Sequence, residues 1–292
     1  MSEAVLMEPA PPIEVEAPPP RTRLASLRRS ATFWTGAAIV LFWTLCAILG
    51  PTLVPQDPYA DHLLHELAPP SAAHWFGTDQ LGRDIFSRVI VGARDILTIA
   101  PLATLLGVVA GIALGLLTGT FGGWIDAVIG RAIEVMVSLP LIIVALLALV
   151  ALGPSSVTVV VVIGLVFAPL ITRTVRAAVL AERGLDYVAA AELRGESRLA
   201  IMVLEILPNI TAPIVVEATV RLGYAIFTVA SLSFLGFGIQ PPSADWGLAI
   251  AENYGVIGGG YWWPVAFDAA ATASLVVGVN LLAEGIQEAL SA

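Results

Sequence analysis

Six apolar runs, each close to 20 residues long, constrain the fold of this chain more than any other feature of its sequence. A helix of about 20 apolar residues crosses the roughly 30 Å hydrocarbon core of a bilayer. The runs cover residues 33–54, 96–119, 132–152, 156–175, 212–235 and 264–283. The sequence therefore predicts an all-α polytopic membrane protein with six transmembrane helices.

Composition also points to lipid as the solvent of this chain. Hydrophobic residues make up 58% of the 292 residues and charged residues 13%, whereas soluble domains carry about a quarter charged residues. No basic tract suggests a nucleic-acid partner. The single cysteine, Cys46, lies inside an apolar run, and an intramolecular disulfide is therefore excluded.

The first apolar run follows a polar tail. Residues 1–20 are rich in proline and glutamate, so they cannot form a core and we expect them to be disordered. Four arginines come next, at Arg21, Arg23, Arg28 and Arg29. The apolar run behind them exceeds the roughly 7–15 residues of a signal-peptide h-region. We therefore interpret it as a first transmembrane helix.

These features divide the chain into four parts. Residues 1–32 form the tail with its basic stop, and residues 33–95 hold the first transmembrane helix and an external segment. Residues 96–285 form a core transmembrane domain, and residues 286–292 form a C-terminal tail.

Arginine distribution predicts the orientation. Six spans place both termini on one side of the membrane, and basic residues concentrate in cytoplasmic loops. With the N-terminus inside, ten arginines are cytoplasmic and three are external. We therefore expect both termini in the cytoplasm.

The absence of lysine excludes one kind of site. All 14 basic residues are arginine, whereas a phosphate-binding loop of the G-x-x-x-x-G-K-[ST] type needs a lysine that reaches the terminal phosphates. We therefore expect no enzyme activity from this chain and assign no catalytic residue. If ATP drives its function, another chain must hydrolyse it.

Glycines form a regular pattern in the second apolar run. They recur every fourth residue, at Gly107, Gly111, Gly115 and Gly119. On a helix this spacing makes one smooth face that another backbone can approach closely. We favour packing within the bundle as their role, and lining of a substrate path is the alternative.

Two opposite charges lie in the fifth apolar run. Glu217 and Arg221 are four residues apart, so they can neutralise each other on one helix face. Charges at this depth are costly and often functional. A structural ion pair and a polar patch on a translocation path are both open.

The long segment between the fourth and fifth runs has helix signals of its own. Asp186 is a suitable N-cap for a short helix over residues 187–194, and Gly195 is a suitable stop. Ser197 can cap a second helix, which Pro208 would end. The sequence therefore predicts a helix–glycine–helix unit.

This unit occupies the loop at residues 177–209. Alanines at 189–191 keep its first helix slender, so that the helix can insert into a groove on a partner protein. Lying on the membrane surface is the alternative.

The external segment carries two pairs of opposite charges. Asp79 and Arg83, and likewise Asp84 and Arg88, are four residues apart. We interpret this pattern as a short amphipathic helix on the outer membrane surface. It would brace the bundle or contact a substrate-binding protein.

Two histidines in the external segment raise the question of a metal site. His62 and His65 have a spacing that can bind a metal. Short polar loops produce this spacing by chance, however, and no motif covers the two residues. We assign no metal site.

The loop resembles that of a known family. Residues 187–195, YVAAAELRG, and the later Leu207-Pro208 resemble the E-A-A-x-x-x-G motif with its downstream L-P. That motif marks the permease subunits of binding-protein-dependent ABC importers, where the loop forms the coupling helix that docks on the ATPase. The resemblance assigns this coupling role to Asp186, Tyr187, Ala189, Ala190, Ala191, Gly195, Leu207 and Pro208.

The motif has two departures in this chain. Ala189 stands where glutamate is usual, and Glu205 stands where related peptide permeases often have histidine. Glu192 or Glu196 would compensate for the missing glutamate.

Two further blocks extend the resemblance. Residues 74–94 are similar to the H-x-L-G-T-D-x-L-G-R-D-x-x-S-R block of dipeptide, oligopeptide and nickel permeases, and residues 232–247 resemble their L-S-F-L-G-L-G and Q-P-P-x-x-x-W-G elements. The chain resembles the second, or "C", permease of the pair, over about residues 30–285.

The resemblance implies a type I ABC importer permease fold in a bacterial inner membrane. A homologous second permease would complete the pathway, one or two kinds of ABC ATPase subunit would bind the coupling loop, and an external substrate-binding protein would deliver the cargo. ATP and Mg would bind to the ATPase subunits, with no cofactor in this chain. Short peptides are the implied cargo, and nickel or a nickel chelate is the alternative.

Two rival functions come from other classes. An ion-coupled secondary transporter predicts internal repeats and several buried carboxylates, and the sequence shows no clear repeat. A membrane enzyme needs clustered catalytic or metal-binding side chains, and none is evident in the sequence.

Overall fold

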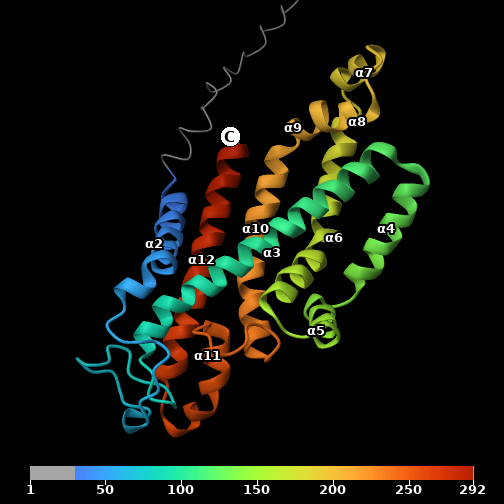
Figure 1. The fold of residues 1–292 in the computed structure, drawn as a ribbon. Coiled ribbons are helices and arrows are strands. Elements are labelled where there is room, and N and C mark those ends of the chain that lie inside the picture. Colours follow the sequence, from blue (N-terminus) through green and yellow to red (C-terminus); the bar gives the residue numbers. More distant parts are fainter. Residues whose placement is uncertain (1–29, 292) are drawn as a thin grey trace, which may run out of the picture.

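The computed structural model describes residues 30–291, so the predicted disordered tail at residues 1–20 lies outside the described residues. The described part is built from helices and contains no strand. Figure 1 shows most of the long helices side by side in one bundle, crossed by α3. The predicted all-α fold is therefore confirmed.

Five helices are long and apolar enough to span a membrane, and one bent pair makes a sixth span. The five are α2 (Ala31–Leu53), α3 (Ile85–Phe121), α6 (Ser156–Glu182), α10 (Thr211–Phe234) and α12 (Trp263–Ser291). The bent pair is α4 (Gly123–Ser138) and α5 (Leu141–Leu152). The predicted number of spans is reached when the pair counts as one.

The third span differs from its prediction. A continuous helix over residues 132–152 was expected, but α4 and α5 are bent by 95° at a short break. The break consists of Leu139 and Pro140, and a proline disfavours helical backbone in the residue before it. Leu139 accordingly has extended backbone, with φ −93° and ψ 142°.

The external segment also differs from its prediction. No amphipathic helix is present over residues 79–84, because the chain remains irregular until α3 begins at Ile85. Asp84 caps α3, since its carboxylate accepts the Ser87 N–H at 2.9 Å. Asp84 therefore does not pair with Arg88 and instead contacts His74 at 3.0 Å. The residues after Asp84 continue directly into the second membrane span.

The glycine face of α3 lies against α6. A Cβ atom on Gly111 would come within 2.6 Å of Ile171, and one on Gly115 would come equally close to Val175. Such distances leave no room for a methyl group, so the two helices pack through backbone and small atoms. This contact is the centre of the buried core.

The bundle has two distinct ends. The helix α7 (Asp186–Leu193) projects at one end, where α2 begins and α12 finishes (Figure 1). The opposite end holds α11 (Trp246–Asn253), the 3-10 turns η1 (Leu63–His65) and η3 (Tyr254–Gly259), and the irregular segment at residues 54–84. We call these the α7 end and the α11 end.

Candidate functional site

The projecting unit at the α7 end contains the predicted helix, glycine and second helix. The N-cap of α7 is Leu185, one residue before the predicted Asp186. Gly195 has a φ of +79°, a conformation that glycine adopts more easily than other residues. Ser197 caps the next helix as predicted, since its hydroxyl accepts the Ala200 N–H at 3.2 Å.

The second helix ends at Asn209, one residue after the predicted Pro208. It begins as α8 (Arg198–Ala200), widens into the π-helical η2 (Ile201–Ile206) and continues as α9 (Leu207–Asn209). Pro208 lies in the first turn of α9, where a proline is tolerated. The unit therefore leads into α10 with little interruption.

Buried contacts hold α7 against η2, and a hydrogen bond ties it to the end of α6. Val188 and Ala191 are buried, and the Tyr187 hydroxyl donates to the Glu182 carboxylate at 2.7 Å. Burial and the adjacent Glu182 carboxylate raise the pKa of Tyr187 to about 12. Tyr187 is therefore a neutral hydrogen-bond donor at neutral pH. The neighbouring alanines, Ala189 and Ala190, are exposed.

An arginine connects the two halves of the unit. Arg194 contacts Glu196 at 2.7 Å and Glu205 at 3.2 Å. Glu205, which stands where the related permeases often have histidine, thus takes part in an internal contact. Glu192 is exposed on α7, and compensation for the missing glutamate stays a hypothesis.

The outer surface of the unit carries exposed leucines beside charged side chains. Leu193, at the end of α7, is 90% exposed, and Leu204 is 70% exposed. Leu199 is also mostly exposed. Exposed apolar side chains grouped at the tip of a projecting element are typical of a surface that contacts another protein.

The charged pair of the fifth span has the expected geometry. Arg221 Nε lies 2.6 Å from a Glu217 carboxylate oxygen, and both side chains are mostly buried. The Arg221 guanidinium also lies 5.5 Å from the centre of the Tyr224 ring. Whether this pair lines a translocation path stays a prediction.

A polar cleft lies between α4 and α6, and the sequence reasoning did not find it. Only Ile133 of α4 is buried in the described structure, because α4 stands away from the bundle. The space between the helices measures about 680 Å³. Its lining consists of Asp126, Ala127, Gly130, Arg131, Ile133, Glu134, Val137, Ser138, Thr172, Arg173 and Arg176. We call it the α4–α6 cleft.

Buried charges brace the α11 end. Arg83 contacts Asp79 and Glu252, each at 2.6 Å, and therefore ties the segment before α3 to α11. Burial alone would lower the pKa of Arg83, but the two carboxylates outweigh it and raise that pKa. Arg88 is buried near the same two carboxylates. These contacts join the segment to α11 without the predicted helix, and its role, bracing or contact with a binding protein, stays a prediction.

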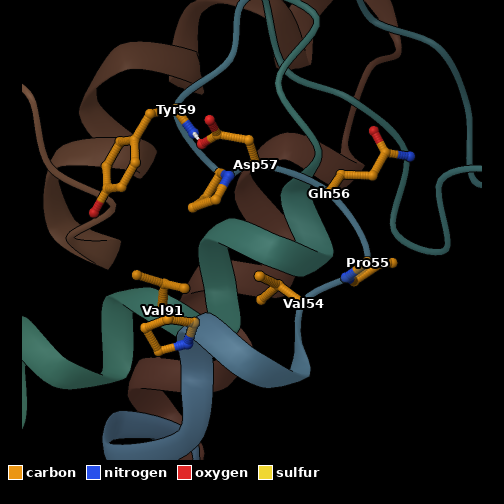
Figure 2. Close-up of a pocket in the computed structure, with 8 residues that line it drawn as sticks. Val54, Pro55, Gln56, Asp57, Tyr59 and Val91 are labelled. Atoms are coloured by element: carbon orange, nitrogen blue, oxygen red, sulfur yellow. Dashed lines mark hydrogen bonds between the residues drawn. The ribbon is translucent and has the colours of Figure 1, made fainter.

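A second cavity, of about 430 Å³, opens where the chain leaves α2. Val54, Pro55 and Gln56 form one side, and Val91 of α3 forms part of its floor (Figure 2). The only charged group in its lining is Asp57, whose carboxylate accepts the Tyr59 N–H at 2.9 Å (Figure 2). No group of three His, Cys, Asp or Glu side chains within residues 30–291 has a metal-binding arrangement.

Comparison with known proteins decides the class of this membrane bundle. Residues 111–292 match the family described as binding-protein-dependent transport system inner membrane component. The chain belongs to this family. Residues 21–70 also match the N-terminal transmembrane domain of oligopeptide transport permease C. The predicted identification as a multi-pass inner-membrane permease component of an ABC transporter is confirmed.

Individual relatives of this inner-membrane permease cover nearly its whole length. The probable D,D-dipeptide transport system permease protein DdpC of Escherichia coli is 39% identical over 90% of this chain and 88% of its own length. The dipeptide transport system permease protein DppC of Bacillus subtilis is 36% identical over 90% and 82%. The di/tripeptide permease protein DppC of Pseudomonas aeruginosa is 36% identical over 87% and 86%.

Proposed function

We propose that this permease forms half of the pathway of an ATP-driven importer of short peptides. The similarity to permeases named for dipeptide and di/tripeptide transport, spread over 87–90% of the chain, carries this proposal. The same names favour peptides over nickel as the cargo. A homologous second permease would enclose the pathway, and an external binding protein would deliver the peptide.

The α7 end is the docking place for the ATPase. Its exposed leucines provide an apolar contact surface, and the arginine distribution supports a cytoplasmic position for this end. ATP and Mg would bind to the ATPase subunits, because this chain has no lysine for a phosphate-binding loop. The coupling residues of the projecting unit would then sense closure of the ATPase dimer.

The connections of α7 explain how such a movement would reach the membrane. Tyr187 binds Glu182 at the end of α6, and Arg194 binds Glu205 close to the start of α10. A displacement of α7 would therefore act on two membrane helices at once. The α3–α6 pair would move as one rigid body, because the two helices are closely packed along the glycine face. Glu217 and Arg221 on α10 would move with it and contribute polar surface to the pathway.

Uptake in cells tests the cargo. Cells lacking the gene, and cells complemented with it, are given labelled dipeptide, a longer peptide and nickel. We expect the deletion to abolish uptake of one peptide class, and complementation to restore it. Lost nickel uptake with unchanged peptide uptake would refute the peptide proposal.

A further inference from the structure

The α4–α6 cleft contains charges that lipid cannot cover. The side chains of Arg131 and Glu134 are 81% and 66% exposed and contact each other at 2.8 Å. Arg173 faces the same cleft and is exposed, with no carboxylate within ion-pair distance among residues 30–291. Charged groups inside a membrane span face either protein or a water-filled cavity. In the assembled transporter we therefore expect the cleft to face protein or water and not lipid.

The polar lining begins at the cytoplasmic edge of the span and continues a short way inward. A helix rises 1.5 Å per residue, so Glu134 lies roughly 3 Å and Ser138 roughly 9 Å inside the apolar run that begins at residue 132. The charged groups of the cleft therefore lie near the cytoplasmic end of α4 and α6, and Ser138 continues the polar lining toward the hydrocarbon core.

The charges of the cleft have both signs. Arg131, Arg173 and Arg176 bring three positive charges, and Asp126 and Glu134 bring two negative charges. Both carboxylates already have an arginine partner, Arg176 for Asp126 and Arg131 for Glu134, so the lining presents two ion pairs and the guanidinium of Arg173. A peptide with free ends carries one carboxylate and one ammonium group, so it matches such a lining. The volume of about 680 Å³ lies within the roughly 300–1,000 Å³ of small-ligand pockets.

We propose that the α4–α6 cleft binds the charged ends of a short peptide during its passage, an inference that rests on the proposed peptide import. Arg173 takes the peptide carboxylate, because its guanidinium is accessible and unpaired within the described residues. Glu134 takes the peptide ammonium group. Arg176 positions α6 against α4, because both its contacts to Asp126 measure 2.6 Å.

Charge variants of Arg173 test this assignment in the complete transporter. We expect Arg173→Gln to lower the uptake of a free dipeptide roughly tenfold, since one charge-assisted contact is lost. Arg173→Lys keeps the positive charge and should retain most of the uptake. Both variants must still co-purify with the ATPase, which shows that the transporter assembles.

The results separate the cleft from the proposed function. If the wild type does not import the dipeptide, the proposed function is wrong and the inference fails with it. If the wild type imports it and Arg173→Gln does so equally well, only the inference is overturned. Equal losses in both Arg173 variants, together with loss of bound anionic phospholipid from the purified transporter, would assign Arg173 to a lipid headgroup and also overturn the inference.

Labelling of the cleft gives an independent readout. Cys46 is the only cysteine of the chain, so Cys46→Ser removes every thiol from this subunit. Gly130 lines the cleft, and a Cβ there would meet no atom within 4 Å. We expect Gly130→Cys in this background to react with a charged thiol reagent. Addition of dipeptide during ATP turnover should slow this reaction. An unreactive thiol, or a rate that the dipeptide leaves unchanged, would contradict the inference.

Discussion

Arg176 of α6 forms a bidentate ion pair with Asp126 of α4. Its Nε donates to Oδ1 and its Nη2 donates to Oδ2, each at 2.6 Å. This contact joins α6 to a helix that otherwise stands away from the bundle. It therefore determines how wide the α4–α6 cleft is. The position of Asp126 in the first turn of α4 adds to the contact, because a negative charge is favoured at a helix N-terminus.

Breaking this ion pair should loosen α4. We expect Asp126→Asn or Arg176→Gln to lower the stability of the purified transporter by about 0.5–1 kcal/mol, since both groups are partly exposed. The double reversal Asp126→Arg with Arg176→Asp should recover much of the loss. Thermal unfolding measures this, and a double variant no better than the sum of its single variants would argue against a direct pairing.

The contact between α3 and α6 should tolerate no added methyl group. We expect Gly115→Ala to destabilise the protein by about 1–3 kcal/mol, because the new Cβ would lie 2.6 Å from Val175. Gly130→Ala is the matched control, since its Cβ meets nothing within 4 Å. Equal melting temperatures for the two variants would show that the α3–α6 contact is less tight than described.

The tip of α7 should hold the ATPase. We expect Leu193→Asp to abolish co-purification of the ATPase while the chain still inserts and folds, because a leucine that is 90% exposed contributes little to the fold. Leu64→Asp is the control, since Leu64 is 97% exposed at the α11 end. Retention of the ATPase by Leu193→Asp would remove α7 from the docking surface.

Stability should depend on pH through Asp245 at the α11 end. Burial raises the pKa of Asp245 to about 6 from its ordinary value of 3.8. Its contribution to stability is therefore fully present below about pH 3.8 and is lost as the pH rises through about 6. Above that pH the native state bears the cost of a buried charge.

Asp245→Asn should remove this cost. The asparagine oxygen can still accept the Leu248 N–H, which caps α11 at 2.9 Å. We expect the stability of the variant relative to the wild type to increase between pH 4 and pH 8, by at most about 3 kcal/mol. Melting temperatures across this range measure the gain. A difference between Asp245→Asn and the wild type that stays constant across this pH range would contradict the prediction.

The apolar runs predicted the positions of the spans because lipid imposes one length and one composition on every crossing helix. The bend after Ser138 had a readable signal in Pro140, but the run around it is so apolar that hydropathy alone gave one continuous helix. The four-residue charge spacing of the external segment also predicted a helix that the structure does not contain. Asp79 and Arg83 do pair, yet they do so across an irregular turn in which Gly82 has a φ of +73°.

The parts of the site that could not be predicted depend on distant residues. Arg83 meets Glu252 across 169 positions of the sequence, and Arg176 meets Asp126 across 50. No local spacing encodes such contacts. The coupling loop was easier to recognise, because its helix, its glycine and the Ser197 cap are all local.

We expect this permease to import peptides only as part of an ATP-driven complex. The most direct test is the uptake of labelled dipeptide into vesicles that contain the permease pair, the ATPase and the external binding protein. We expect accumulation that requires both ATP and the binding protein. Accumulation by the permease without any ATPase, driven by an ion gradient, would contradict it and favour a secondary transporter.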